Sequence, residues 1–462
     1  MSKLNFSLND LFNLQSAEIF EPEKYYPVSK ISIDSRTVEK DSIFVAIKGE
    51  KLDGHDFVKD AAEKGAAAIV INKSEIERYD DIDLTIVTVD DTTKTYGELA
   101  KIRRRNAGYK IVSITGSNGK TSTKEMTADL LSEKFIVDKS IANNNNHIGV
   151  PLTILSAKPK TNAIVVEHGT NHFGEIDYTA KIAEPDIALI TNVGDAHLEF
   201  LKNRNEVYNE KSTLLIETVK AKGKVLINYD DPILKKHAKD FVKHISYGFK
   251  GDVDIKGVIT GYTNDGRTQI KIAKSNNSFE VELPVYGESN AKNYLAAVAL
   301  ALTMGLTKSQ IVSGTNKTKA VKGRLNVTKL DDRMIIDDTY NSNPNSVKAA
   351  VDLLKKVKLY KRKILLLGDM FELGNKSKEM HGMIGEYIAK KKVDAVYSLG
   401  EFMKYMHAVV KKDGIESKHF SSRDDLKTFL AKNNFSNAAI LVKGSRGMKM
   451  EEFTELFKNK VQ

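Results

Sequence analysis

The sequence of 462 residues contains no cysteine, so disulfide bonds and thiolate metal sites are excluded and a reducing compartment is expected. It also lacks an uninterrupted run of about 18 apolar residues, the length that a membrane-spanning helix needs. The N-terminal segment lacks the apolar core of a signal peptide. These absences predict a cytoplasmic protein that does not insert into a membrane.

The charge is not balanced, because lysine and arginine exceed aspartate and glutamate and give a formal net charge of +10. A basic surface can bind nucleic acid, but here the lysines are spread along the whole chain and the tightest arginine cluster is Arg103–Arg105. No recognisable nucleic-acid-binding module accompanies them. We therefore expect no nucleic-acid partner, and a positive cleft would suit small phosphorylated substrates.

The length predicts two to four domains, and a hydrophobic content of 41% is sufficient for large cores. We divide the chain into three regions at 1–108, 109–319 and 320–462. In each region short apolar runs alternate with helical stretches, a pattern that predicts parallel βαβ units and an α/β fold. The expected strands are 43–47, 67–71, 109–114, 163–166, 187–190, 224–227, 334–336, 363–367, 395–399 and 439–442.

Three further segments have patterns of their own. Residues 251–286 alternate apolar and polar side chains between turn signals, which predicts an antiparallel meander inserted at the edge of the second sheet. An alanine-rich helix is expected from about residue 290 to 304, and an amphipathic helix near 55–65.

A glycine turn follows the expected strand 109–114 and precedes an expected helix at 121–132. Glycines let backbone N–H groups point at phosphate oxygens, the helix start adds partial positive charge, and Lys120 can reach the β- and γ-phosphates. The spacing departs from the usual motif, because the usual first glycine would fall on Ile114. The context predicts ATP binding by Gly116, Ser117, Asn118, Gly119, Lys120, Thr121 and Ser122.

Candidate magnesium ligands stand at the ends of neighbouring strands. The Thr121 hydroxyl can ligate Mg²⁺, the strand 163–166 ends at Glu167, and the strand 187–190 leads to His197. In open α/β sheets, ligands bind beyond the carboxyl ends of the strands. The pattern therefore predicts that Thr121, Glu167 and His197 surround the metal.

Ordered motifs along nearly the whole chain resemble those of the Mur ligase family. The matching runs are Asp34–Val38, Thr115–Thr121, Asn145–Thr153, Glu167–His172, Asp195–Leu198, Gly323–Arg324, Asp337–Pro344, Gly368–Gly374 and Lys443–Arg446. The resemblance implies three domains: a UDP-substrate-binding domain, a central ATPase-like domain with a parallel sheet and a phosphate loop, and a mobile Rossmann-like C-terminal domain.

The resemblance also implies roles for particular residues. It places Ser35 and Arg36 near the UDP moiety, Asn290 and Asn293 beside the adenine, and Arg324 and Asp338 at the nucleotide. It aligns Lys211 with a lysine that such ligases carry as a carbamate, which would join the metal ligands. The remaining expected substrate contacts are Asn145, Asn146, Asn341 and Asn343. Three residues depart from the family pattern: His147, His168 and Ser289.

The implied activity is ATP-dependent amide formation through an acyl phosphate, in the cytoplasmic synthesis of peptidoglycan precursors. The segment Gly368–Gly374 resembles that of family members that join D-alanyl-D-alanine to UDP-N-acetylmuramoyl-tripeptide, and a monomer is expected. A sister ligase that adds the third amino acid is an alternative, although the Asp-Asn-Pro-Arg run of the diaminopimelate-adding ligase is absent. A folylpolyglutamate synthase-like ligase is another. A phosphate-loop switch would need an Asn-Lys-x-Asp run after the loop, and none is present.

Overall fold

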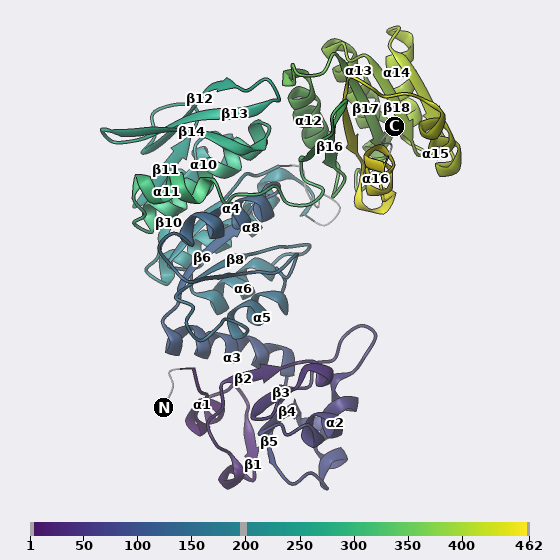
Figure 1. Ribbon diagram of the computed structural model, residues 1–462. Coiled ribbons are helices and arrows are strands. Elements are labelled where there is room, and N and C mark those ends of the chain that lie inside the picture. The colour runs from purple at the N-terminus through teal and green to yellow at the C-terminus, as the bar shows by residue number, and fades with distance from the viewer. Residues whose placement is uncertain (1–3, 195–200, 460–462) are drawn as a thin grey trace.

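The computed structural model describes residues 4–194 and 201–459 and contains three β-sheets, each flanked by helices. Figure 1 shows the three α/β units arranged along the molecule, with the first at the bottom of the view and the third at the top right. Within the described residues, no helix has the length and apolar character needed to cross a membrane.

The first unit is built on a five-stranded sheet with the order β1-β5-β4-β3-β2, in which only β1 and β5 run antiparallel. The two strands predicted here are confirmed as β3 and β4. The helix predicted near 55–65 is shorter, because a 3₁₀ turn occupies Gly54–Phe57. The elements are α1 (Leu8–Phe12), β1 (Glu18–Phe20), β2 (Lys30–Ser32), β3 (Ser42–Val45), α2 (Val58–Glu63), β4 (Ala68–Asn72) and β5 (Thr85–Val89).

Helix α3 (Thr92–Ala107) joins the first unit to the second. It begins at Asp91, whose carboxylate accepts the N–H groups of Thr93 and Lys94, and it ends at Gly108, which has a φ of +67°. Its buried face packs against α5 and α6 of the second unit. One apolar core therefore runs from the first sheet, through α3, to the second sheet.

The second unit is built on a nine-stranded sheet with the order β14-β13-β12-β11-β10-β9-β6-β8-β7. The strands β6 to β11 are parallel, and β12, β13 and β14 form the predicted antiparallel meander at one edge. The strands are β6 (Lys110–Thr115), β7 (Val137–Lys139), β8 (Ala163–Glu167), β9 (Ile187–Ile190), β10 (Lys224–Asn228), β11 (His244–Gly248), β12 (Ile255–Tyr262), β13 (Arg267–Lys274) and β14 (Asn277–Tyr286). The helices are α4 (Lys120–Leu131), α5 (Gly149–Leu155), α6 (Glu175–Ala183), α8 (Arg204–Lys220), α9 (Pro232–Lys236), α10 (Glu288–Thr303) and α11 (Lys308–Thr315).

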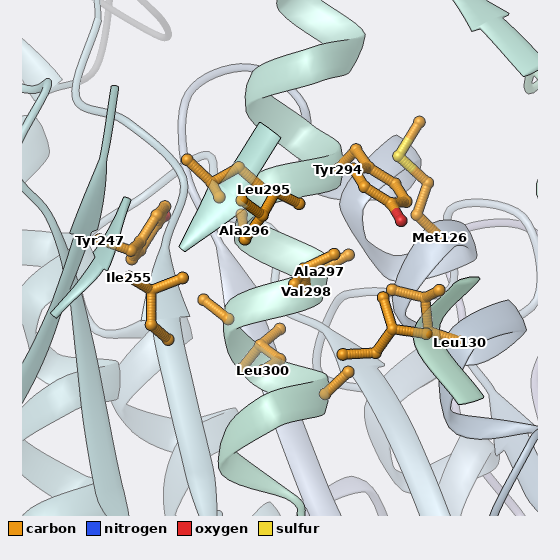
Figure 2. Close-up of a cluster of buried hydrophobic side chains, with 14 of the residues drawn as sticks. Met126, Leu130, Tyr247, Ile255, Tyr294, Leu295, Ala296, Ala297, Val298 and Leu300 are labelled. Carbon is orange, nitrogen blue, oxygen red and sulfur yellow. The ribbon is translucent and has the colours of Figure 1, made fainter. Parts of the chain in front are cut away.

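Helix α10 fixes the position of α4, which carries the phosphate loop at its start. Figure 2 shows α10 side chains between Met126 and Leu130 of α4 on one side and Tyr247 and Ile255 of the sheet on the other. The small alanines of α10 let the two helices approach closely, and each residue from 294 to 301 is buried. Close packing of this kind holds the loop rigidly on the sheet.

The third unit has a six-stranded sheet with the order β15-β16-β20-β17-β18-β19, in which only β15 is antiparallel. All four strands predicted in this region are confirmed. The strands are β15 (Asn326–Lys329), β16 (Arg333–Asp338), β17 (Arg362–Gly368), β18 (Ala395–Leu399), β19 (Glu416–Phe420) and β20 (Ala438–Lys443). The helices are α12 (Pro344–Lys356), α13 (Ser377–Lys391), α14 (Met403–Lys412), α15 (Arg423–Lys432) and α16 (Glu451–Asn459).

The third unit docks on the tip of the β12–β13 hairpin, which reaches toward α12 in Figure 1. Asn264 O accepts the N–H groups of Lys358 and Leu359 at 2.9 and 3.0 Å. The buried carboxylate of Asp265 forms an ion pair with Lys329 of β15. The meander therefore contributes to the arrangement of the units as well as to the second sheet.

Candidate functional site

The loop between β6 and α4 has a backbone that glycine adopts with little strain. Gly116 has a φ of +150° and Gly119 a φ of +83°. A Cβ on Gly116 would lie 1.9 Å from Thr191 Oγ1, and one on Gly119 would lie 2.2 Å from Asn293 Oδ1. The two glycines therefore let the loop approach β9 and α10 closely, as a phosphate-binding turn requires.

Two residues after β9 hold this loop in place. Thr191 Oγ1 donates to Asn118 O at 2.6 Å, and Asn192 Oδ1 accepts the Asn118 N–H at 3.0 Å. Thr191 and Asn192 stand in the run that leads to His197, but their contacts with the loop were not predicted from the sequence. Ser117 N–H also bonds to Asn192 O at 3.0 Å, so the N–H groups of Ser117 and Asn118 are occupied, and the first turn of α4 offers N–H groups to a phosphate.

Lys120 lies over this loop at the start of α4. Its ammonium donates to Gly116 O at 2.8 Å. Burial lowers the pKa of Lys120, the charge of Glu167 opposes that shift, and the charge of Arg324 adds to it. Lys120 is therefore influenced by two charged groups from different units, the carboxylate of Glu167 in the second and the guanidinium of Arg324 in the third. Thr121 is half-buried and Ser122 is buried in the same first turn.

Glu167 ends β8, the strand beside β6, and its side chain is only 2% exposed. Its Oε1 accepts a hydrogen bond from Asn145 Nδ2 at 2.9 Å. Its Oε2 is buried without a hydrogen-bond partner among the described residues. A buried carboxylate oxygen without a donor among the described residues fits a hard cation that prefers oxygen ligands.

A complete protein cage for a metal is not present, since the described residues hold no group of three or more histidine, aspartate or glutamate side chains that could bind one. Magnesium commonly keeps waters and phosphate oxygens and uses few protein ligands. His197, the predicted third ligand, lies outside the described residues.

Lys211 lies on α8, which packs against α6 and β9, and its side chain is 1% exposed. Burial, with the nearby charge of Lys120 as a second cause, lowers the pKa of Lys211 to about 7, while Glu210 opposes the shift. Glu210 is held by the start of α6, where it accepts the N–H groups of Gly174 and Ile176 at 2.8 and 2.9 Å. Lys211 is therefore a buried lysine of α8 and not a solvated one.

The two asparagines of α10 have different surroundings. Asn290 is buried, and its Nδ2 donates to Tyr286 O at 2.9 Å. Asn293 lies one turn later and is the residue that a side chain at Gly119 would meet. Of the two, Asn293 is thus the one in contact with the phosphate loop.

The third unit reaches the loop through the turn that precedes α12. Asn343 Nδ2 donates to Asn118 Oδ1 at 3.1 Å. The Arg324 guanidinium lies 4.1 Å from the centre of the Tyr340 ring. These contacts bring side chains from two motifs of the third unit, Gly323–Arg324 and Asp337–Pro344, to the edge of the site.

Two other predicted residues of this unit are bound to a buried lysine. Asp338 Oδ2 pairs with Lys443 Nζ at 2.6 Å, and Asp338 Oδ1 accepts the Leu325 N–H at 3.2 Å. Lys443 also donates to Asn341 O at 2.9 Å. Lys443 belongs to the motif Lys443–Arg446. Its buried ammonium, bonded to Asp338 and Asn341, shows why a lysine stands at the first position of that motif.

Residues predicted to contact the sugar nucleotide are not gathered at this loop. Ser35 and Arg36 lie in the first unit, where Arg36 is exposed and forms a two-pronged ion pair with Asp34. Asn146 lies just before α5, and its Oδ1 accepts the Gly149 N–H at 2.9 Å. Among the predicted substrate residues, Asn145 and Asn343 are the two with hydrogen bonds to Glu167 or to the loop.

His168, a departure from the family pattern, is a core residue. Its ring nitrogens bond to Thr179 Oγ1 and Ser113 Oγ, each at 2.9 Å. Burial lowers its pKa to about 3, so the ring is neutral. His147 is exposed and Ser289 half-buried, so neither belongs to a buried network of this kind.

Three family models match successive parts of this chain. A model described as "Mur ligase family, catalytic domain" matches residues 27–104, the "Mur ligase middle domain" matches 114–301, and the "Mur ligase, glutamate ligase domain" matches 323–446. Each match falls within one of the three units described above.

Known proteins are similar to the chain over nearly its full length. A UDP-N-acetylmuramoyl-tripeptide--D-alanyl-D-alanine ligase of Haemophilus influenzae is 35% identical over 98% of this chain and 99% of its own. A crystal structure of MurF from Acinetobacter baumannii matches with a TM-score of 0.84 and 30% identity, over 98% of this chain and 99% of that one. The MurF ligase of Thermotoga maritima in complex with ADP matches with a TM-score of 0.81 and 29% identity, over 93% and 97%.

Proposed function

This chain belongs to the Mur ligase family, and we propose on that basis that it is an ATP-dependent ligase that joins D-alanyl-D-alanine to UDP-N-acetylmuramoyl-tripeptide. The observation that carries the proposal is the 35% identity to a ligase of that name over almost the whole of both chains. The phosphate loop beside Glu167 and Lys211 supplies the chemistry that such a reaction needs.

The first chemical step activates a carboxylate. A carboxylate oxygen of the tripeptide attacks the γ-phosphorus of ATP, the bond from that phosphorus to the bridging oxygen breaks, and ADP leaves. Such a transfer needs positioning and charge neutralisation rather than a protein nucleophile. Lys120, released from Gly116 O, and the start of α4 are placed to neutralise the charge on the phosphates.

The second step forms the amide. The neutral amine of the dipeptide attacks the acyl carbon, the bond from that carbon to the phosphate oxygen breaks, and phosphate leaves with the electron pair while the nitrogen loses a proton. Water would hydrolyse the acyl phosphate if it entered. The third unit, whose Asn343 contacts Asn118 of the loop, is placed to cover the site and exclude water.

Magnesium fits the residues at the end of β8 and the start of α4. We assign Thr121, Glu167, His197 and a modified Lys211 as the protein groups that would hold it. When bound, the cation would neutralise developing charge on the transferred phosphoryl group. The buried Oε2 of Glu167, which lacks a donor among the described residues, is the observation that supports this assignment.

Lys211 is proposed to carry a carbamate. A neutral amine attacks the carbon of CO₂, an N–C bond forms, and a proton leaves to water, which converts the side chain to an anion with two oxygens. Burial in the field of Lys120 favours the neutral amine that this reaction needs. The product would supply oxygen ligands where an ammonium would repel the cation.

The other contacts follow the division of the chain into domains at 1–108, 109–319 and 320–462, which the three sheets and the three family matches support. Ser35 and Arg36 are assigned to the UDP end, Asn290 and Asn293 to the adenine side, and Arg324 and Asp338 to the nucleotide from the third domain. Asn145, Asn146, Asn341 and Asn343 are assigned to the peptide substrates. The use of ATP suits a cytoplasmic location, and a monomer remains the prediction from the sequence.

The decisive experiment is to supply the wild-type protein with ATP, UDP-N-acetylmuramoyl-tripeptide and one acceptor at a time, and to weigh the product. Phosphate release is expected to depend strongly on D-alanyl-D-alanine, with little turnover on diaminopimelate, lysine or glutamate. Faster turnover with a single amino acid would instead assign the protein to a sister ligase.

A further inference from the structure

Lys124 lies one helical turn after Lys120 and has no part in the mechanism described above. Its side chain is 0% exposed, although lysine is almost never fully buried unless it is paired. Its ammonium donates to Ser140 O at 2.6 Å and to Ala142 O at 3.2 Å, and it lies 3.1 Å from Glu125 Oε1. Burying this cation is costly, so its partners indicate what it holds in place.

Two of the partners belong to the turn 140–145, which follows β7. Ala142 in this turn has a φ of +50°, a left-handed conformation that is unfavourable for a residue with a Cβ. The hydrogen bonds from Lys124 to the carbonyl groups of Ser140 and Ala142 hold the backbone in that conformation. The ammonium therefore fixes the course of the turn.

The same turn holds Glu167 at two points. Ser140 Oγ accepts the backbone N–H of Glu167 at 3.1 Å, and Asn145 Nδ2 donates to Glu167 Oε1 at 2.9 Å. Gly169 N donates to Asn145 O at 2.8 Å, and a Cβ on Gly169 would lie 2.5 Å from Asn145 Oδ1. Glu167 is thus held by Ser140 and Asn145, the first and last residues of the turn. Lys124 holds the same turn by its hydrogen bonds to the carbonyl groups of Ser140 and Ala142.

Lys124 also acts on the other carboxylate oxygen. Its Nζ lies 3.8 Å from Glu167 Oε2, which is close enough for electrostatic attraction but too long for a hydrogen bond. Oε1 is occupied by the Asn145 amide, while Oε2 faces no hydrogen-bond donor among the described residues. This arrangement leaves one oxygen of a fixed carboxylate available to a ligand.

We propose that Lys124 is a positioning residue that fixes Glu167, through the turn 140–145, for a divalent cation. The proposal rests on the proposed function, because it concerns the metal that accompanies ATP. Lys124 does not touch the substrate. Residues that orient a ligating carboxylate commonly change metal affinity by about 10- to 100-fold when they are removed.

The test compares Lys124→Met with Lys139→Met. Lys139 pairs with the same Glu125 but has no hydrogen bond to the turn or to Glu167, so it is a matched control for the loss of one ammonium. Binding of Mn²⁺ to the complex with ADP is measured from the electron paramagnetic resonance signal of free Mn²⁺, which needs no turnover. We expect Lys124→Met to raise the Mn²⁺ Kd by about tenfold or more and Lys139→Met to leave it within about twofold.

Kinetics and a second variant complete the test. In Lys124→Met the Mg²⁺ concentration for half-maximal activity should rise while KM for D-alanyl-D-alanine stays the same, a split that general loss of structure would not produce. If Lys124→Met does not fold, Asn145→Ala removes the contact of the turn with Glu167 Oε1 alone and should also weaken Mn²⁺ binding.

An unchanged Mn²⁺ Kd in a folded Lys124→Met protein, or in Asn145→Ala, would overturn the proposal. So would a wild-type protein that binds no Mn²⁺ together with ADP. Failure of the proposed function is a separate result, since a wild-type protein that binds Mn²⁺ and ADP but forms no product with the dipeptide would leave the role of Lys124 intact.

Discussion

The side chains at the phosphate loop carry more positive than negative charge. Lys120 lies in the electrostatic field of Glu167 and Arg324, and Lys124 Nζ lies 3.8 Å from Glu167 Oε2. Burial is the main cause that lowers the pKa of Lys120 and of Lys211, and the charge of Arg324 adds to the shift of Lys120 while the charge of Lys120 adds to that of Lys211. Cations that lower one another's pKa in this way are complemented by an anion that carries several charges, such as a nucleoside triphosphate. The charge pattern of this site is therefore complementary to a polyanionic ligand.

Lys120→Ala tests the loop at this scale. The lysine is expected to neutralise the γ-phosphate during transfer, so its loss should lower kcat by about 10²–10³-fold or more. Folding should survive, because the hydrogen bond that its ammonium makes within the described residues goes to the loop carbonyl of Gly116. Steady-state phosphate release and the thermal unfolding midpoint check both statements, and near wild-type turnover would show that the active site lies elsewhere.

Lys211→Ala tests the carbamate. Without the two carbamate oxygens the variant should be nearly inactive, and a short carboxylic acid in the buffer should restore part of the rate by occupying the space left by the side chain. Lys220→Ala, which removes a lysine at the exposed end of the same helix, is the matched control and should keep full activity.

A direct readout of the modification accompanies the kinetics. Wild-type protein equilibrated with ¹³C-labelled CO₂ should show a carbamate carbon resonance that is absent from Lys211→Ala. Full activity in Lys211→Ala, or the same resonance in both proteins, would remove Lys211 from the site.

At the scale of elements, the apolar runs were sufficient to predict the strands that the site depends on. The runs 109–114, 163–166 and 187–190 correspond to the adjacent strands β6, β8 and β9, whose ends carry the phosphate loop, Glu167 and Thr191. Such runs report burial directly, which explains why the expectation held.

Other elements and contacts could not be predicted, because their reasons lie far away in the sequence. The three-residue strand β7 has no apolar run, and it forms by pairing with β8. A lysine in a helix is expected to have a solvated side chain. Lys124 is buried because carbonyl groups 16 and 18 residues away accept hydrogen bonds from its ammonium. His168 departs from the family pattern beside Glu167. Its hydrogen bonds to Ser113 and Thr179, which are distant in the sequence, show that it belongs to the core.

His381 links two elements of the third unit. From α13 its Nε2 accepts the backbone N–H of Met370 at 3.0 Å, and its Nδ1 donates to Ser377 O at 2.6 Å. Met370 lies in the motif Gly368–Gly374, so this ring anchors the motif to the helix. Only a neutral ring can accept at Nε2, which agrees with burial as the cause that lowers the pKa of His381.

This pairing predicts a loss of stability in acid. The unfolded chain takes up a proton near pH 6.5, whereas the folded chain resists it, so stability falls as the pH drops below about 6.5 toward the folded pKa, by at most about 1.4 kcal/mol per pH unit for this group. His381→Gln keeps an acceptor for Met370 N–H and does not titrate. Its unfolding midpoint should therefore fall less between pH 7.5 and about pH 5.5 than that of the wild type.

The exposed His147→Gln is the control, and it should keep the pH dependence of the wild type. Identical slopes for His381→Gln and the wild type would mean that this ring does not contribute to the acid sensitivity.

At the scale of the whole molecule, the position of the third unit depends on contacts outside the phosphate site. The hairpin tip 263–266 packs against the segment after α12, where Gly266 lies close to Val357. Asp265 accepts from Tyr286 OH at 3.0 Å and pairs with Lys329, and these cations and donors lower its pKa below the usual range of a carboxyl group against the opposing effect of burial. The docking that holds Asn343 at the loop therefore includes one buried anion beside the two hydrogen bonds to Asn264 O.

Asp265→Asn tests this dependence. The amide leaves Lys329 without its counter-ion, while Arg267 keeps its ion pair with Glu282, and the docking should weaken by about 1–2 kcal/mol, since Lys329 is partly exposed. Because the sequence has no cysteine, nitroxide labels on cysteines introduced at the exposed Asn276 and Lys412 would attach at those two positions alone.

Double electron–electron resonance should give a narrow distance distribution in the otherwise wild-type protein and a broader one in Asp265→Asn, in keeping with a roughly tenfold shift in population. Asp252→Asn, which changes an exposed carboxyl in the segment before β12, should leave the distribution narrow. If Asp265→Asn also stays narrow, the hairpin does not control the domain arrangement, and the contacts of Asn343 and Arg324 with the loop would have to maintain it by themselves.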